Sequence, residues 1–298
     1  MGECCSGNLL LERDYGFVVL SSSLSRMNEK QLKKARDCAV SAARKVGGML
    51  RANLNRAKRI THSHRHDIKL ELDVRSQNQI ERLLEQSFPG IAVLGEEGIV
   101  GNENSPERWV VDPIDGTVNF TYGIPHACIS IALQRRNSES SVGTGNGDVY
   151  ETIVGVVYDP FCDEMWTATC RGRAYLNGSI IQTSDRARLT DAIVSIGISK
   201  FPRTIKLMLP QLDHLMRRAR KVRIMGAAAL GMVYVACGRF DAYIEPRIRL
   251  WDIAAGGLIL ERAGGEFWRQ SVRGKHAYKV IANNGLLRKK LPKLNFDV

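Results

Sequence analysis

A short apolar run that ends in two acidic residues constrains this chain more than any other segment. Trp109-Val110-Val111 has the composition of a buried strand, and it leads into Asp112-Pro113-Ile114-Asp115-Gly116-Thr117. The run Ile91–Leu94 leads in the same way into Gly95-Glu96-Glu97. We expect both runs to be buried strands that deliver carboxylates at their C-terminal ends, where ligand sites of α/β sheets usually lie.

The rest of the chain alternates between helical and strand-like patterns. Apolar residues at helical spacing predict a helix that begins after Asn28, a plausible N-cap with Gln31 three residues on, and a second helix over Ser76–Ser87. Asn177-Gly178 is typical of a tight turn. Further strands are predicted at 128–133, 153–157, 165–168, 193–198 and 241–245, further helices at 204–220, 227–237 and 252–263, and a polar loop at 134–148.

This alternation predicts a layered α/β fold with two subdomains. The chain has 298 residues, near the upper limit for one hydrophobic core. We expect an irregular N-terminal extension at 1–27, an N-terminal α+β subdomain at 28–190 that carries most of the candidate ligands, and a C-terminal α/β subdomain at 191–298.

Charge and cysteine content limit the functional class. The net charge is +12, and basic residues gather at 51–65 and 217–223, but no nucleic-acid-binding motif accompanies them. We therefore expect a solvated basic surface and no nucleic-acid partner. The seven cysteines form no C-x-x-C pair, which favours reduced thiols in the cytoplasm. No apolar run reaches the ~18 residues of a membrane span, and a secretory signal is not expected.

The N-terminus carries a candidate lipidation pattern. Gly2 followed by Ser6 fits the myristoylation motif, and Cys4 and Cys5 are candidate palmitoylation sites. Two acyl chains together would hold the protein at a membrane. Two alternatives remain open: the match arises by chance, or translation begins at Met27.

Five acidic residues stand where the predicted elements break. Several carboxylates crowded at strand ends raise one another's pKa unless a cation neutralises them. Ligands that are all oxygen select hard ions, and Mg²⁺ is the common partner of carboxylates and substrate phosphate. The Asp115-Gly116-Thr117 turn can add backbone N–H groups that bind an anion. The acidic residues are Glu96, Glu97, Asp112, Asp115 and Asp252.

These motifs resemble those of the inositol monophosphatase family. The likeness covers about residues 28–287 and rests on Gly95–Glu97, Asp112–Thr117, Trp251-Asp252 with Ala254-Ala255, Ala263–Gly265 and Ile281–Asn284. It implies an alternating α-β-α-β-α sandwich of the inositol monophosphatase/fructose-1,6-bisphosphatase type. It also implies a homodimer that hydrolyses a small phosphate monoester with Mg²⁺, most simply a phosphorylated polyol such as myo-inositol monophosphate.

The resemblance assigns metal ligands residue by residue. Glu96, Asp112 and the backbone carbonyl of Ile114 match the first metal site of the family. Asp112, Asp115 and Asp252 match the second site. Glu96 would also help to hold a third ion through water molecules, so that two or three Mg²⁺ ions are implied for each active site.

The resemblance also assigns catalytic and substrate-binding residues. Thr117 and Asp73 match the pair that orients and deprotonates the attacking water, with Glu96 counted among the catalytic residues. The amides of Gly116 and Thr117 would hold the phosphate. Glu245 and Ala228 match positions that contact the substrate.

Two departures from the family pattern bear on the substrate. The segment 61–72 lacks the family's lysine-containing loop and its Asp-x-Val-Thr pattern, and its histidines predict a solvated loop, or alternatively a metal-binding tract. Ala227 stands where many members carry threonine or serine. Histidinol phosphate, sugar bisphosphates and nucleotide bisphosphates therefore remain alternative substrates.

Two other functions compete with this interpretation. A haloacid-dehalogenase-type phosphatase would use an aspartyl nucleophile in D-x-D-G-T, but here two residues separate Asp112 from Asp115. A catalytically dead, lipid-anchored binding protein would use the basic surface at membranes. The full set of acidic residues argues against such decay.

Overall fold

The first helix begins where the sequence predicts. The computed structural model describes residues 27–64, 67–137, 150–198 and 202–292. Helix α1 (Glu29–Asn53) starts at a capping box in which the Asn28 side chain accepts from the Gln31 N–H at 2.9 Å and the Gln31 side chain accepts from the Asn28 N–H at 2.8 Å. Both residues therefore act as predicted. Lipidation of Gly2, Cys4 and Cys5 concerns residues outside the described part.

The segment before Asp73 differs from the prediction. Helix α2 (Glu71–Ser87) begins at Glu71 rather than at Ser76, so the predicted start was wrong. A hairpin of β1 (Ile60–His64) and β2 (Asp67–Leu70) stands where a loop was expected. The carboxylate of Asp73 accepts a hydrogen bond from the Leu70 N–H at 2.6 Å and so caps the start of the helix. The apolar spacing of α2 gives no indication of this cap.

The larger sheet has eight strands in the order β10-β9-β8-β7-β6-β5-β3-β4. Strands β3 and β5 are parallel and the other neighbours are antiparallel. Helices α1 and α2 cover one face of this sheet. The strands are β3 (Ala92–Gly95), β4 (Gly98–Val100), β5 (Glu107–Asp115), β6 (Cys128–Arg136), β7 (Tyr150–Asp159), β8 (Glu164–Thr169), β9 (Tyr175–Leu176) and β10 (Ser179–Ile180).

The smaller sheet has five strands in the order β12-β11-β13-β15-β14. Helix α4 (Pro202–Arg218) contacts its outer side, and the two predicted helices α5 (Ala228–Ala236) and α6 (Leu250–Arg262) lie between the sheets. The strands are β11 (Ile193–Ile196), β12 (Lys221–Arg223), β13 (Ala242–Arg249), β14 (Glu266–Ser271) and β15 (Ala277–Asn283). The short elements are α3 (Thr117–Thr121), η1 (Leu189–Asp191) and η2 (Arg288–Lys290).

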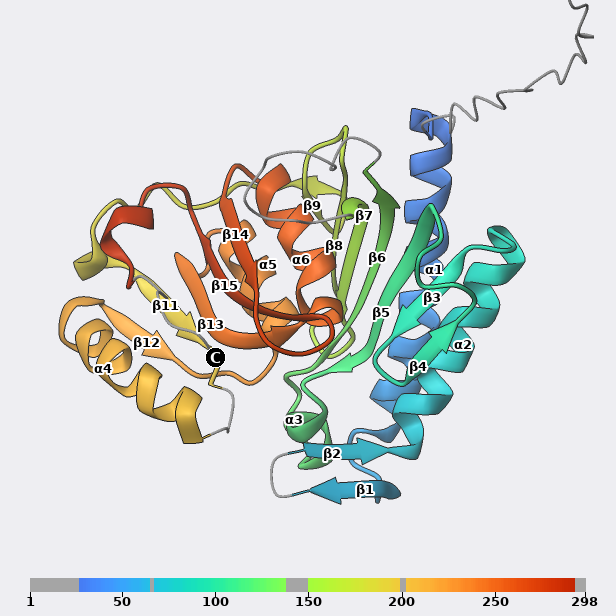
Figure 1. Cartoon of the computed structure of the whole chain (residues 1–298), viewed down its shortest axis with the longest axis horizontal. Helices are drawn as coiled ribbons and strands as arrows, with labels where there is room; N and C mark the ends of the chain where they lie inside the picture. Colours follow the sequence, from blue (N-terminus) through green and yellow to red (C-terminus); the bar gives the residue numbers. More distant parts are fainter. Residues whose placement is uncertain (1–26, 65–66, 138–149, 199–201, 293–298) are drawn as a thin grey trace, which may run out of the picture.

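The five layers form the predicted sandwich. From one side of the molecule to the other, the layers are α1 with α2, the larger sheet, α5 with α6, the smaller sheet, and α4 (Figure 1). This order confirms the α-β-α-β-α architecture that the resemblance implied. The division into subdomains at 190/191 stays a prediction.

Helices α5 and α6 are apolar nearly all round because a sheet lies on each side of them. A Cβ at Gly155 in β7 would lie 2.7 Å from the Ala255 carbonyl oxygen, so this glycine lets α6 approach the larger sheet closely. That approach brings the first turn of α6, with Asp252, to the end of β5.

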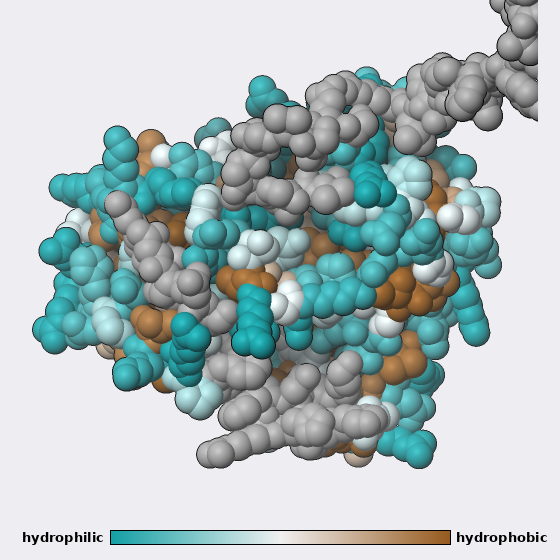
Figure 2. Space-filling model, in the orientation of Figure 1, coloured by the Kyte–Doolittle hydropathy of each residue, from teal (hydrophilic) through white to brown (hydrophobic). Residues whose placement is uncertain are grey.

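In the described part of the chain, no helix is both long and apolar enough to cross a bilayer. Hydrophilic residues cover most of the face in Figure 2.

Candidate metal and phosphate site

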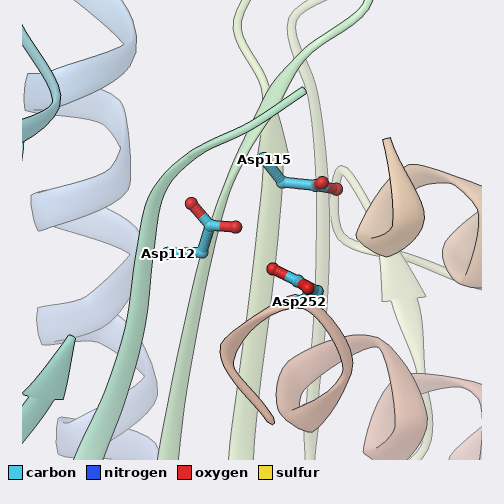
Figure 3. Close-up of side chains that lie close together, drawn as sticks. All are labelled: Asp112, Asp115 and Asp252. Carbon is cyan, nitrogen blue, oxygen red and sulfur yellow. The ribbon is translucent and has the colours of Figure 1, made fainter. Parts of the chain in front are cut away.

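Three aspartate carboxylates from two elements meet in one space. Asp112 and Asp115 come from the end of β5, and Asp252 comes from the first turn of α6 (Figure 3). One carboxylate oxygen from each residue lies within 4.8 Å of the others. Asp112 and Asp115 are buried and Asp252 is half-buried. The structure therefore brings together three of the predicted ligands.

An irregularity in β5 explains how two aspartates three residues apart share this space. In a regular strand, residues i and i+3 point to opposite faces. The register between β5 and β6 shifts between Asp112 and Asp115, as at a β-bulge, and re-aims the side chains. Pro113 fits there because it has no N–H to give to the ladder. The Asp112 Oδ1 accepts from the Ile114 N–H at 2.9 Å and holds the turn.

The Asp115 carboxylate is fixed by the start of another helix. Its Oδ1 accepts from the Ala228 N–H at 3.1 Å and its Oδ2 from the Ala229 N–H at 2.7 Å, both in the first turn of α5. The free N–H groups and the dipole of a helix start both favour a negative charge. The backbone N–H of Ala228 thus contacts a predicted metal ligand, and its contact with substrate stays a prediction.

Asp252 has two roles at once. Its Oδ2 accepts from the Arg249 N–H at 3.0 Å, which caps the start of α6. The carboxylate nevertheless belongs to the group of three acidic side chains at the site. The capping hydrogen bond therefore holds the Asp252 carboxylate in the cluster, and capping is not its only role.

Glu96 and Asp73 stand at the edge of the cluster. Glu96 follows β3, and its N–H donates to the Val111 carbonyl oxygen at 3.2 Å, which ties it to β5. Burial, then the charges of Asp252 and Asp73, raise the pKa of Glu96 well above its usual range, while a hydrogen bond with Asp112 opposes this. Asp73 is buried in the first turn of α2. Glu96 therefore lies beside the aspartates, and Asp73 lies near enough to Glu96 for its charge to act on it.

The same crowding perturbs the three aspartates. Burial, followed by the charges of Glu96 and Asp252, raises the pKa of Asp112 well above its usual range. Burial and then the charge of Asp252 raise the pKa of Asp115 to about 7, against the lowering effect of the α5 amides. Burial raises the pKa of Asp252 to about 6. A cation would relieve this repulsion, and an all-oxygen set of carboxylates fits a hard divalent ion.

Gly116 and Thr117 follow the cluster directly. Gly116 has φ of 92°, and a Cβ there would lie 2.9 Å from the His126 carbonyl oxygen, so only glycine fits without strain. Thr117 begins α3, and its hydroxyl donates to the Ile114 carbonyl oxygen at 2.8 Å. Because the hydroxyl proton lies in this hydrogen bond, the lone pairs of the Thr117 oxygen can accept a hydrogen bond from a water molecule.

Glu245 faces the cluster from the smaller sheet. The Tyr243 hydroxyl donates to its carboxylate, and a Cβ at Gly197 would lie 2.1 Å from its Oε2, so Gly197 makes room for it. Burial raises the pKa of Glu245 to about 8, with further contributions from the charges of Asp252 and Asp115. The carboxyl group of Glu245 therefore lies near the cluster, and its contact with substrate stays a prediction.

The sequence reasoning missed two side chains of the site. Tyr243 stands two residues before Glu245 on β13, and residues i and i+2 of a strand share a face, so this pattern could have indicated it. Cys128 is buried with its Sγ 3.6 Å from the Asp115 Oδ2, and burial raises its pKa well above the usual range. Its partner follows from the β5–β6 register, which the sequence does not contain.

Known proteins resemble this chain over most of its length. The profile of the inositol monophosphatase family matches residues 31–294. The "Nus factor SuhB" of Xylella fastidiosa is 34% identical over 264 residues, which cover 85% of this chain and 90% of that protein. The inositol monophosphatase of Dictyostelium discoideum is 34% identical over 267 residues, which cover 86% of this chain and 93% of that protein.

Solved structures show the same likeness. The extragenic suppressor protein suhB from Bartonella henselae superimposes with a TM-score of 0.75 at 31% identity, covering 85% of this chain and 95% of that one. The inositol monophosphatase from Anabaena superimposes with a TM-score of 0.71 at 29% identity, covering 87% of this chain and 94% of that one.

Proposed function

The chain belongs to the inositol monophosphatase family and is a phosphatase, and from this premise we propose that it hydrolyses myo-inositol monophosphate with Mg²⁺. The observation that carries the proposal is the group of three aspartates whose carboxylates lie within 4.8 Å of one another. A cation bound between these carboxylates would offset their mutual repulsion.

The donor set indicates which residues would hold the metal. Asp112, Asp115 and Asp252 would hold one ion, and Glu96 would hold another together with Asp112 and the Ile114 carbonyl. When bound, Mg²⁺ would lower the pKa of a water molecule and offset the charge of the phosphate. Two or three ions per site agree with the number of carboxylates.

The chain's own residues would bind and orient the reactants. The Thr117 hydroxyl donates a hydrogen bond to the Ile114 carbonyl oxygen, so the Thr117 oxygen would accept a hydrogen bond from the attacking water. Asp73 would take up a proton from that water. As the water oxygen bonds to phosphorus, the ester P–O bond breaks, and the alcohol oxygen leaves and takes a proton from solvent.

Other groups would fix the substrate. The amides of Gly116 and Thr117 would bind the phosphate oxygens at the turn that only glycine permits. Glu245 would accept hydrogen bonds from the hydroxyl groups of the polyol. Hydroxyl groups that donate to the Glu245 carboxylate would favour its ionised form and so lower its pKa from about 8.

The assembly and location of the protein complete the proposal. By likeness to the family, the chain would act as a homodimer in the cytoplasm. Acylation at Gly2, Cys4 and Cys5, if present in the mature protein, would bring it to membranes.

A phosphate-release panel tests the substrate and the metal. We expect release from myo-inositol monophosphate with Mg²⁺ to exceed release from histidinol phosphate, a sugar bisphosphate and a nucleotide bisphosphate, and to stop with EDTA. Greater release from one of the other esters would reassign the substrate. An acid-stable phosphoaspartyl group on the enzyme after rapid quenching would contradict the direct attack by water.

A further inference from the structure

A second pocket lies far from the carboxylates, at the end of the molecule that carries α4. It has a volume of about 760 Å³ and is formed where η1, the C-terminal half of α4, and η2 with the two residues after it meet. In Figure 1, α4 lies at the outer side of the smaller sheet, beyond the layers that hold the aspartates. The lining residues of this basic pocket are Arg188, Leu189, Thr190, Gln211, His214, Arg217, Arg218, Lys289, Lys290, Leu291 and Pro292.

The charge of the basic pocket has one sign. Among the described residues that line it, five are arginine or lysine and none is aspartate or glutamate. Nearby carboxylates neutralise only part of this charge: Asp191 pairs with Arg188 at 2.8 Å, and Asp213 pairs with Arg217 at 2.9 Å. Within the described part of the chain, Arg218 and Lys289 have no carboxylate partner.

The pocket is built on a rigid base. Leu189 and Leu291 are buried and belong to the core that joins α4 to the smaller sheet. Lys290 donates from its ammonium group to the Ala187 carbonyl oxygen, which ties η2 to the segment before η1. Segments that lie about a hundred residues apart in the sequence are thus held together around one space. The cationic side chains therefore stand on a fixed frame rather than on a loop.

The size and the chemistry of the pocket define its ligand. Its volume falls within the ~300–1,000 Å³ of typical small-molecule sites, far more than one phosphate needs. Arginine binds phosphate through two parallel N–H groups, and lysine binds it as a point charge. Thr190, Gln211 and His214 add further polar groups to the lining. We propose that the basic pocket binds a small molecule that carries at least two phosphate groups.

Calorimetric titration with inorganic tripolyphosphate tests this proposal. The full chain is used in EDTA, so that the catalytic carboxylates repel the anion and do not compete for it. We expect saturable binding, weakened at least tenfold in Arg218→Gln/Lys289→Gln. Lys33→Gln/Lys45→Gln, on the exposed side of α1, removes the same charge and is expected to change the affinity less than twofold. Equal losses in the two variants, or no saturable binding, would overturn the proposal.

A second arm identifies the source of the phosphates. Sedimentation compares vesicles that contain a bisphosphorylated inositol lipid with phosphatidylserine vesicles of equal charge. Stronger binding to the inositol lipid, lost in the Arg218/Lys289 variant, supports the pocket and assigns a lipid headgroup. Equal binding to both vesicles, with tripolyphosphate bound in solution, supports the pocket and assigns a soluble ligand. Both variants are expected to keep phosphatase activity, so this test does not depend on the proposed function.

Discussion

At the scale of single residues, Gly116 shows how backbone geometry and chemistry meet at the site. Its φ of 92° is strained for any residue with a Cβ, and the Cβ would also lie 2.9 Å from the His126 carbonyl oxygen. The strain alone costs about 1–2 kcal/mol. The contact adds to this cost and displaces the Thr117 amide, which is predicted to bind the phosphate.

A pair of glycine substitutions separates these two effects. Gly264 has φ of 89° but nothing within 4 Å of its Cβ position. We therefore expect Gly264→Ala to lower the free energy of unfolding by about 1 kcal/mol and to leave the activity intact. We expect Gly116→Ala to cost more than this and to lower phosphate release on the order of a hundredfold. Urea unfolding and phosphate release measure both. Equal effects of the two changes on activity would contradict a phosphate-binding role for this turn.

The sequence identifies individual carboxylates well and their contacts poorly. Asp112 and Asp115 are recognisable because acidic residues directly after an apolar strand are rarely solvated surface residues. The two α5 amides that hold Asp115 are not recognisable, because they come from more than a hundred residues away and carry no side-chain signal. Contacts of this kind depend on the tertiary fold.

At the scale of elements, the end of β11 controls the position of Glu245 on β13. Gly197 follows β11, and its N–H donates to the Ile244 carbonyl oxygen at 2.9 Å. A Cβ at Gly197 would lie 2.1 Å from the Glu245 Oε2. Gly197→Ala is therefore expected to push this carboxylate out of place without changing any ionisable group.

Kinetics with two substrates measure this displacement. We expect Gly197→Ala to raise KM for myo-inositol monophosphate about tenfold, or ~1.4 kcal/mol. The kcat/KM for a small aryl phosphate without hydroxyl groups should change less than threefold. Gly48→Ala on α1, where nothing lies within 4 Å, is the matched control. An equal loss with both substrates would indicate a general disturbance and would contradict the assigned role of Glu245.

The elements themselves are predictable where the apolar period is strong. The predicted helices at 204–220 and 227–237 agree within two residues with α4 and α5, and Asn177-Gly178 forms the predicted turn with φ of 49° and 84°. Strands β14 and β15 were missed. Strand β14 is half-exposed with a mixed sequence, so no clear alternation indicates it. The hairpin before Asp73 was missed because the pairing of β1 with β2 defines it, and the composition of the segment does not indicate that pairing.

At the scale of the whole molecule, the carboxylate cluster links folding to pH and to metal. The pKa of Asp115 is raised to about 7 and that of Asp252 to about 6 in the folded chain, from 3.8. Between pH 4 and 7 the folded state thus binds more protons than the unfolded state, and stability falls as pH rises. This contribution is fully present below pH 4 and lost above pH 7.

Thermal unfolding tests this linkage. Without metal, we expect the chain to lose on the order of 4 kcal/mol of stability between pH 5 and pH 7.5, seen as a lower Tm. Saturating Mg²⁺ should remove most of this loss, since we propose that it binds only the ionised cluster of the folded state. A Tm that is constant or rises between pH 5 and pH 7.5 in EDTA would contradict the linkage. A decrease of Tm over this pH range that Mg²⁺ does not reduce would also contradict the linkage.

The layered architecture was predictable as a class and, through the resemblance, as a sandwich. The strand order was not, because β5 pairs with β3 in parallel and with β6 in the antiparallel sense, and residue periodicity is the same for both. The basic residues at 217 and 218 show a similar limit. Their sequence indicated a solvated surface, whereas the fold joins them to Arg188 and Lys289 around one pocket.

Asp112 offers the most direct test of the central claim, which is metal-dependent hydrolysis at the aspartate cluster. In Asp112→Asn the side-chain oxygen can still accept from the Ile114 N–H, so the turn is retained while one charge is lost. Asp37→Asn, on the exposed side of α1, is the control for charge. The measurement is phosphate release from myo-inositol monophosphate with Mg²⁺. The account predicts a loss of at least about a hundredfold, ~2.7 kcal/mol, for Asp112→Asn and none for Asp37→Asn. Activity of a folded Asp112→Asn protein equal to that of the unaltered chain would contradict it.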